Sequence, residues 1–363
     1  MSIAEPTDRK GETDRPPFAR NDDIRLERKA PDRNILDRDR IVDGLKQWGV
    51  VLVFALVLAT FSFLLPATFP TARNAINVLN NSSALVLFST AATLALILGE
   101  FDLSFPAVAD LVAVGVGVLV TTFGWKSELG VVGAVALGVS AGALIGLVNG
   151  VLIAKAFVPS FVATLAVGSI AAGCELAAQS WIQGGAKQIS QIVLPPLVQT
   201  LGDARLPQTQ IKGSVAAALG VAAVLWLWSR RTVAGRRSYA IGGNPMGAYL
   251  AGVPVAGLRI LGFMIVGGVS ALVGVITVAE RGYFNFASPP LMLQAYSAAF
   301  LGAAVFSKKR RFDIFGSVFS AFFLLVLSNG LSLMNQPRWI GSVISGIILL
   351  VAVLANMPKN RKV

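Results

Sequence analysis

Long apolar runs alternate with short polar connections from about residue 48 to the end of the chain. A helix needs about 20 apolar residues to cross a hydrocarbon core of ~30 Å. We therefore predict ten membrane helices, at about 48–66, 76–98, 102–123, 129–154, 160–181, 213–229, 258–280, 291–306, 312–334 and 339–356. The eighth is short, and a broken or re-entrant segment is the alternative there.

Composition supports an all-α polytopic membrane protein. The 363 residues are 55% hydrophobic and 14% charged, with a mean hydropathy of +0.69. Residues 1–46 contain eleven acidic and eleven basic residues, so the net charge of +12 arises in the rest of the chain. We predict a charged, disordered tail over 1–46, a transmembrane domain over 47–357 and a basic end over 358–363. Because the excess basic residues flank apolar runs, nucleic acid is not an expected partner.

The basic residues also predict an orientation. Dense clusters occur at 230–237, at 308–311 and after residue 358, whereas the alternate connections carry single charges. Cytoplasmic loops are enriched in Lys and Arg. We therefore predict that both termini and the 230–257 loop are cytoplasmic and that 182–212 is external.

Several kinds of chemistry are excluded or unsupported. The chain has no histidine and one cysteine, Cys174, which excludes an intrachain disulfide and a histidine-based metal or proton site. It also contains no G-x-x-x-x-G-K-[ST] phosphate loop. We expect no cofactor and no metal on this chain, and any ATP hydrolysis belongs to another subunit.

The stretch from Arg230 to Val255 is a basic, glycine-containing connection between two apolar runs. We predict an arginine-rich entry, a tight turn at Gly242-Gly243, and a short helix over Pro245–Leu250, because proline suits the first turn of a helix. A short helix on the membrane face is suited to docking a partner.

This stretch resembles the signature loop of permease subunits of bacterial ABC importers of the ribose, xylose and galactose type. The family pattern G-R-x-x-Y-A-I-G-G-N is matched from Gly235 to Asn244, whereas Ala251-Gly252-Val253 replaces a final S-G-I. The resemblance implies that the loop couples the chain to an ATPase. The implied coupling residues are Arg236, Arg237, Tyr239, Gly242, Gly243, Asn244, Gly247 and Gly252.

A second stretch, LGEFDLSFPAV at 98–108, is similar to the family's G-G-I-D-L-S-V-G, with Glu100 in place of a glycine. We expect Asp102 to accept backbone N–H bonds at a helix start, assisted by Ser104. Direct contact with the transported solute is the alternative role.

A third stretch, 149–169, resembles the family's N-G-x-L-I-x-x-x-x-I-P-x-F-I-x-T-L. Phe161 and Thr164 are expected on one face of a helix, where an aromatic ring and a hydroxyl could contact a sugar, although packing is the alternative. The chain departs from the family between 291 and 317, where Met292 occupies a glutamate position, and rejoins it at Ser328-Asn329. The expected translocation residues are Asn80, Ser83, Asp102, Ser104, Phe161, Thr164 and Asn329.

These observations favour a permease subunit that imports a small hydroxylated solute, a sugar or polyol, across the bacterial inner membrane. The resemblance implies an ABC ATPase, an external solute-binding protein and a second permease copy, identical or paralogous, as partners in a lipid membrane. The alternative is a stand-alone secondary transporter, for which Asp110 and Glu175 are the candidate coupling acids. An intramembrane enzyme has little support.

Overall fold

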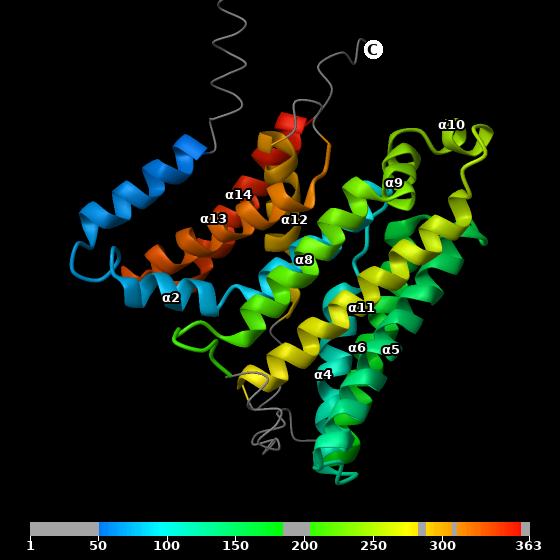
Figure 1. Ribbon diagram of the computed structural model, residues 1–363, viewed down its shortest axis with the longest axis horizontal. Helices are drawn as coiled ribbons and strands as arrows, with labels where there is room; N and C mark the ends of the chain where they lie inside the picture. The colour runs from blue at the N-terminus through cyan, green and yellow to red at the C-terminus, as the bar shows by residue number, and fades with distance from the viewer. Residues whose placement is uncertain (1–50, 184–203, 282–287, 307–310, 357–363) are drawn as a thin grey trace, which may run out of the picture. The chain divides into compact units, whose positions relative to one another are not determined.

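The computed structural model describes residues 51–183, 204–281, 288–306 and 311–356 (Figure 1). Contacts divide the chain into Met1–Gly44 and Leu45–Val363, and all described residues belong to the second unit. The described helices are Val51–Leu64, α2 (Ala72–Asn80), α3 (Ser83–Ile97), α4 (Phe105–Thr121), α5 (Glu128–Ala154), α6 (Ser160–Gln183), α8 (Gly213–Arg231), α9 (Val233–Gly243), α10 (Pro245–Leu250), α11 (Val255–Arg281), α12 (Ser288–Phe306), α13 (Ile314–Leu333) and α14 (Arg338–Asn356).

The all-helical, polytopic fold class is confirmed for the described residues. Among the described helices, five are long and apolar enough to cross a membrane, and α2 with α3 adds a sixth if this bent pair is one span. Four further apolar helices, Val51–Leu64, Phe105–Thr121, Leu291–Ala304 and Trp339–Leu354, are shorter. The count of ten membrane spans therefore stays a prediction.

The structure places a break in the second predicted segment, which was expected to be continuous, and none in the eighth, where a break was the alternative. The eighth predicted segment forms one continuous helix, α12, whereas the second is divided into α2 and α3, which meet at 49°. The cause is the polar run that separates them: the Asn81 side chain donates to the Asn77 carbonyl oxygen, and Ser82 Oγ donates to that of Leu79. Such local bonds compete with the helical ladder and end α2.

Helix α3 is the centre of the described bundle. Nearly all of its residues are buried, and it contacts α8, α11, α12 and α13. A helix that is apolar all round belongs inside a bundle. This position makes its two ends the points where the surrounding helices meet.

Helices α5 and α11 lie side by side (Figure 1) and pack closely. A Cβ added at Gly146 would lie 2.1 Å from the Phe263 carbonyl oxygen, and one at Gly150 would lie 2.7 Å from Ile260 Cα. Small residues let two helix backbones approach in this way. Gly146 and Gly150 of α5 therefore form a packing seam with α11.

The predicted connections between helices lie in two groups, one at each end of the bundle. At the first, which we call the α9 end, Arg230 pairs with Asp313 and Arg259 with Glu100. At the other, which we call the Asn80 end, Asn80 contacts Lys212. This sorting agrees with the predicted alternation of the chain. Which end is cytoplasmic stays a prediction, and the predicted tail, the basic C-terminal end and residues 184–203 lie outside the described residues.

Candidate functional site

The predicted turn at Gly242-Gly243 is wrong, because both glycines belong to helix α9. Helix α9 begins after Thr232, whose Oγ1 accepts a hydrogen bond from the Gly235 N–H at 3.0 Å. Neither Gly242 nor Gly243 has a positive φ. The physical reason for a glycine at 242 is therefore close packing rather than backbone freedom.

Gly242 contacts the end of α3. A Cβ at Gly242 would lie 2.2 Å from the Ile97 carbonyl oxygen and 3.0 Å from the Gly99 nitrogen. Gly99 ends α3 with φ of +78°, and the N–H of Glu100 donates to the Ala95 carbonyl oxygen at 3.0 Å. This is the Schellman arrangement that favours glycine. Two glycines thus bring the backbones of α3 and α9 into direct contact.

The short helix Pro245–Leu250 is confirmed as α10. Asn244 Oδ1 accepts from the Gly247 N–H at 2.9 Å, and Pro245 occupies the first turn. A Cβ at Gly247 would lie 2.9 Å from Asn244 Nδ2, so glycine there leaves room for the capping side chain. At the other end, Gly252 has φ of +78° and the Val253 N–H donates to the Ala248 carbonyl oxygen. Both ends of α10 are therefore capped locally.

Helix α10 presents an apolar surface to solvent. Met246 is 67% exposed, Tyr249 67% and Leu250 78%, whereas Ala248 packs against Leu98 and Ile241. Three large apolar side chains on one six-residue helix form an exposed patch of the kind that marks an interaction site. We call Met246, Tyr249 and Leu250 the α10 patch.

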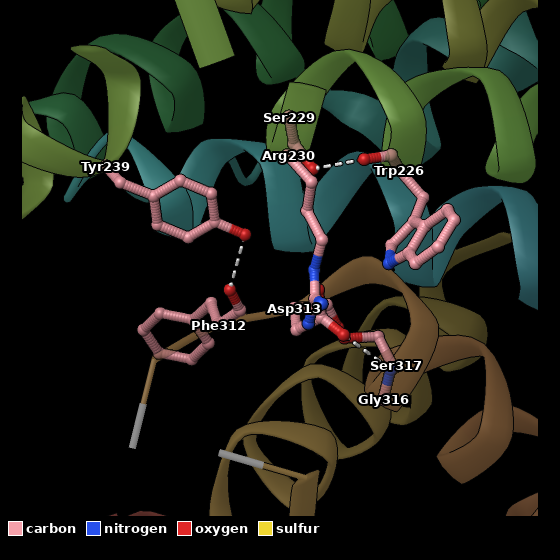
Figure 2. A network of polar contacts seen from close by, with 8 residues as sticks. All are labelled: Trp226, Ser229, Arg230, Tyr239, Phe312, Asp313, Gly316 and Ser317. Carbon is pink, nitrogen blue, oxygen red and sulfur yellow. Dashed lines mark hydrogen bonds and ion pairs between the residues drawn. The ribbon is translucent and has the colours of Figure 1, made fainter. Parts of the chain in front are cut away.

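Helix α9 is also hydrogen-bonded to the segment that precedes α13 (Figure 2). Tyr239 Oη donates to the Phe312 carbonyl oxygen at 3.0 Å. Arg230, at the end of α8, donates from Nε to Asp313 Oδ1 at 3.1 Å. Burial and the nearby Asp313 carboxylate raise the pKa of Tyr239, so its hydroxyl stays protonated near neutral pH.

The segment between α3 and α4 is held by side chains from two other helices, α6 and α12. The N–H of Phe101 donates to Ser160 Oγ, that of Asp102 to Tyr296 Oη, and that of Leu103 to Thr164 Oγ1. The Ser104 N–H donates to Asp102 Oδ1 at 2.7 Å. Asp102 thus accepts a backbone N–H at a helix start, as predicted. Four successive backbone N–H groups, from Phe101 to Ser104, have side-chain partners. This segment between α3 and α4, which we call the helix break, is therefore an ordered structure.

Phe161 and Thr164 lie three positions apart on the continuous helix α6, but their side chains differ in exposure. Thr164 is fully buried against Leu103, whereas Phe161 is 57% exposed. Residues three apart differ by about 60° around a helix axis, so they are neighbours even where one is buried and the other is exposed. Contact of this pair with a solute stays a prediction. Ser104 Oγ bonds to both Asp102 Oδ1 and Asn149 Nδ2, which joins α4 to α5.

The other predicted translocation residues lie at the Asn80 end or bridge helices. Asn80 accepts from the Lys212 N–H at 2.8 Å and donates to the Gln210 carbonyl oxygen. Ser83 donates to Glu280 Oε1 at 3.1 Å. Asn329 on α13 accepts from Asn74 on α2 at 3.0 Å. The structure therefore separates the predicted residues into groups at different places instead of one cluster.

Sequence reasoning missed the partner of Glu100. Arg259 on α11 contacts Glu100 Oε1 from Nη2 at 2.8 Å, and both side chains are largely buried. The charge that departs from the family pattern is therefore neutralised. The sequence does show a basic residue, Arg259, near the start of an apolar run, which could have indicated a buried ion pair. Nothing in the sequence identified Glu100 as its partner. Tyr296 and Ser160, which hold the helix break, were missed for the same reason.

The two acidic residues that were candidate coupling groups for a stand-alone secondary transporter, Asp110 and Glu175, are buried. Asp110 on α4 is 4% exposed and Glu175 on α6 is fully buried, with Gln179 Nε2 donating to Glu175 Oε1 at 2.9 Å. Among the described residues no group of three or more acidic or sulfur ligands could hold a metal ion.

Comparison with known proteins identifies a family. A family model described as "Branched-chain amino acid transport system / permease component" matches residues 74–353. The "L-arabinose ABC transporter permease protein AraH" of Azospirillum brasilense is 32% identical over 317 residues, covering 86% of this chain and 88% of that protein. The "Autoinducer 2 import system permease protein LsrC" of Escherichia coli is 29% identical over 280 residues, covering 76% and 77%. No solved structure matches this chain.

The family match covers most of the described helices and includes α9, α10 and the helix break. It confirms the resemblance found in the 230–255 loop. The chain is thus a multi-pass inner-membrane transport subunit and not itself an enzyme. The family model and these relatives show that the chain belongs to the family of sugar-type ABC importer permeases.

Proposed function

We propose that this chain forms the membrane pathway for a small hydroxylated solute, a sugar or polyol, and that α10 docks the ATPase that drives transport. The observation that carries the proposal is the contrast between α9 and α10. Helix α9 is fixed to α3 through Gly242 and to the segment before α13 through Tyr239, whereas the α10 patch is exposed. An exposed docking element joined to an anchored helix can pass a partner's movement into the bundle.

We propose that the movement of the ATPase is transmitted from α10 through α9 to the helix break between α3 and α4. Gly242 contacts Ile97 and Gly99, and Gly99 is followed by the segment that Ser160, Thr164 and Tyr296 hold. A displacement of α9 would act on the point where α3, α4, α6 and α12 meet. This arrangement supports alternating access with the α9 end facing the cytoplasm.

The partners follow from the family. Permeases of ABC importers operate with an ATPase subunit and a solute-binding protein, so ATP would bind to the ATPase and not to this chain. We expect a second permease copy to complete the pathway. Relatives named for L-arabinose and autoinducer 2 support a hydroxylated solute. Family membership does not favour the stand-alone secondary transporter.

The docking role is tested by Leu250→Ser and Met246→Ser in the full complex. Removing a central apolar contact from an interface costs above ~1 kcal/mol, which is at least about a fivefold loss of affinity. We expect normal membrane abundance but reduced co-purification of the ATPase and reduced ATP-dependent uptake. The matched control is Phe123→Ser, because Phe123 is 68% exposed and follows α4, away from α10.

Full co-purification and full uptake in both α10 variants would show that α10 is an ordinary solvated segment. The solute class is tested separately, by competition for uptake in proteoliposomes that contain all subunits. Sugars or polyols should compete, whereas competition by a branched-chain amino acid alone would contradict the solute assignment.

A further inference from the structure

One aromatic ring of the helix break is exposed. Phe101 is 43% exposed, whereas its neighbours Glu100 and Asp102 are 8% and 1% exposed. The Phe101 N–H donates to Ser160 Oγ at 3.2 Å, so the backbone that carries this ring is fixed. The proposed function treats the helix break as the point where the movement of α9 arrives, and it gives the Phe101 ring no role.

Two rings of α12 support Phe101. Its ring centroid lies 5.7 Å from that of Tyr296 at an interplanar angle of 38°, and 6.4 Å from that of Phe300 at 27°. Tyr296 is itself held in place, because its hydroxyl accepts from the Asp102 N–H at 2.9 Å and donates to the Asp102 carbonyl oxygen at 2.6 Å. The exposed part of the Phe101 ring is therefore a flat surface in a fixed position, which needs little ordering when a ligand binds.

The helix break lies among the apolar helices and not beyond their ends. Tyr296 is near the middle of the apolar stretch Leu291–Ala304 of α12. Thr164, which accepts from the Leu103 N–H, lies about one turn inside the span Ser160–Gln179. Many transporters hold their solute where a helix is interrupted inside the membrane domain. Phe101 is therefore at a depth that suits a transport pathway.

The backbone beside Phe101 requires polar surroundings. Among the described residues, no hydrogen bond ends on the carbonyl oxygen of Gly99, Glu100 or Phe101. In a membrane domain, non-helical backbone of this kind is covered by protein or lines a water-filled path, and it does not face lipid. Ser160 adds a donor, because its Oγ accepts from the Phe101 N–H and its own proton is used in none of the described hydrogen bonds. An aromatic ring beside a few polar groups is typical of a site for a small ligand.

We infer that the exposed Phe101 ring is a stacking surface for a cyclic sugar that passes the helix break. The face of an aromatic ring carries partial negative charge, and the C–H groups on one face of a sugar ring carry partial positive charge, so the two faces attract each other. An open-chain polyol has no preformed flat face and loses more freedom when it stacks. The inference rests on the proposed transport of a hydroxylated solute and narrows that solute to a cyclic sugar. The family pattern G-G-I-D-L-S has isoleucine at this position, so the ring is a feature of this chain.

Water access to Phe101 is tested by thiol labelling of the assembled complex in proteoliposomes, with Cys174 replaced by serine. Phe101→Cys is treated from both sides with a sulfonated, membrane-impermeant thiosulfonate, which reacts with the thiolate formed in water. The matched control is Leu56→Cys, because Leu56 is 65% exposed on the continuous apolar helix Val51–Leu64. We expect Phe101→Cys to react and Leu56→Cys not to react. A mixture of D-ribose, D-xylose, D-galactose and L-arabinose should slow the reaction of Phe101→Cys.

The preference for a ring is tested by uptake of the same sugar mixture and of the corresponding open-chain alditols. One solute-binding protein is used throughout, so a change in the sugar-to-alditol ratio arises from the permease. Phe101→Ile introduces the residue of the family pattern, Phe101→Tyr retains a ring, and Phe63→Ile is the control, because Phe63 is 85% exposed on Val51–Leu64. An aromatic contact of this kind changes affinity about two- to tenfold. We expect Phe101→Ile to lower the ratio by that factor, and the other two variants to keep the wild-type ratio.

The outcomes separate this inference from the proposed function. Absence of labelling at Phe101→Cys, because lipid or a second copy covers it, would overturn the inference. Equal labelling of Leu56→Cys, or labelling of Phe101→Cys that the sugars do not slow, would also overturn it. An unchanged sugar-to-alditol ratio in Phe101→Ile would do the same while leaving the proposed function intact. Uptake of neither mixture by the wild-type complex would instead contradict the solute class of the proposed function.

Discussion

Replacing Gly242 by alanine tests whether α9 acts on α3 through direct backbone contact. The added Cβ would lie 2.2 Å from the Ile97 carbonyl oxygen and 3.1 Å from its carbonyl carbon. Both are backbone atoms, which cannot rotate away, so α9 and α3 would have to separate. Overpacking of this kind costs ~1–3 kcal/mol. Alanine also favours a helix over glycine by ~1 kcal/mol. Subtracting this gain in helix propensity from the steric cost leaves an expected net loss of up to about 2 kcal/mol.

The neighbouring residue provides a matched control. A Cβ at Gly243 would have no heavy atom within 4 Å, and Gly243 has no positive φ. Gly243→Ala should therefore leave the unfolding midpoint unchanged or raise it slightly. The assays are thermal unfolding of the purified chain and solute-stimulated ATP hydrolysis in the assembled complex. We expect Gly242→Ala to insert normally, unfold at a lower temperature and couple poorly. The same midpoint and the same coupling in both variants would refute a role for the α3–α9 contact.

Two further predictions concern the ends of the bundle. After Cys174, which is exposed, is replaced by serine, single cysteines at Arg237 and Arg205 should react from opposite sides of the membrane, with Arg237 on the cytoplasmic side; labelling from one side would contradict the topology. Glu100→Gln should destabilise the chain by about 1–3 kcal/mol, because it leaves the largely buried Arg259 without its partner. Combining it with Arg259→Gln should recover part of the loss in a double-mutant cycle, and purely additive losses would show that the pair is not coupled.

The sequence alone predicted those features that depend on residues close together in the chain. Helix α10 was found at its observed bounds because Asn244 and Pro245 cap it locally. The turn at Asp102 was found for the same reason, since its carboxylate bonds two residues ahead. The apolar runs located the helices because each must satisfy its own backbone hydrogen bonds in lipid. The resemblance of the loop to a permease family, later confirmed, also rested on contiguous residues.

Contacts between distant residues were decided only by the tertiary structure. Gly242 was interpreted as a turn residue because the sequence does not reveal that the end of α3 lies against it. Glu100 and Arg259 are 159 positions apart, and Asp102 and Tyr296 are 194 apart. Apolar helices can be packed in many rotations about their axes with similar burial, so periodicity could not tell that Thr164 is buried while Phe161 is exposed. Those rotations are set by close contacts between helices, such as the glycine seam of α5 and α11, which exist only once the helices have packed.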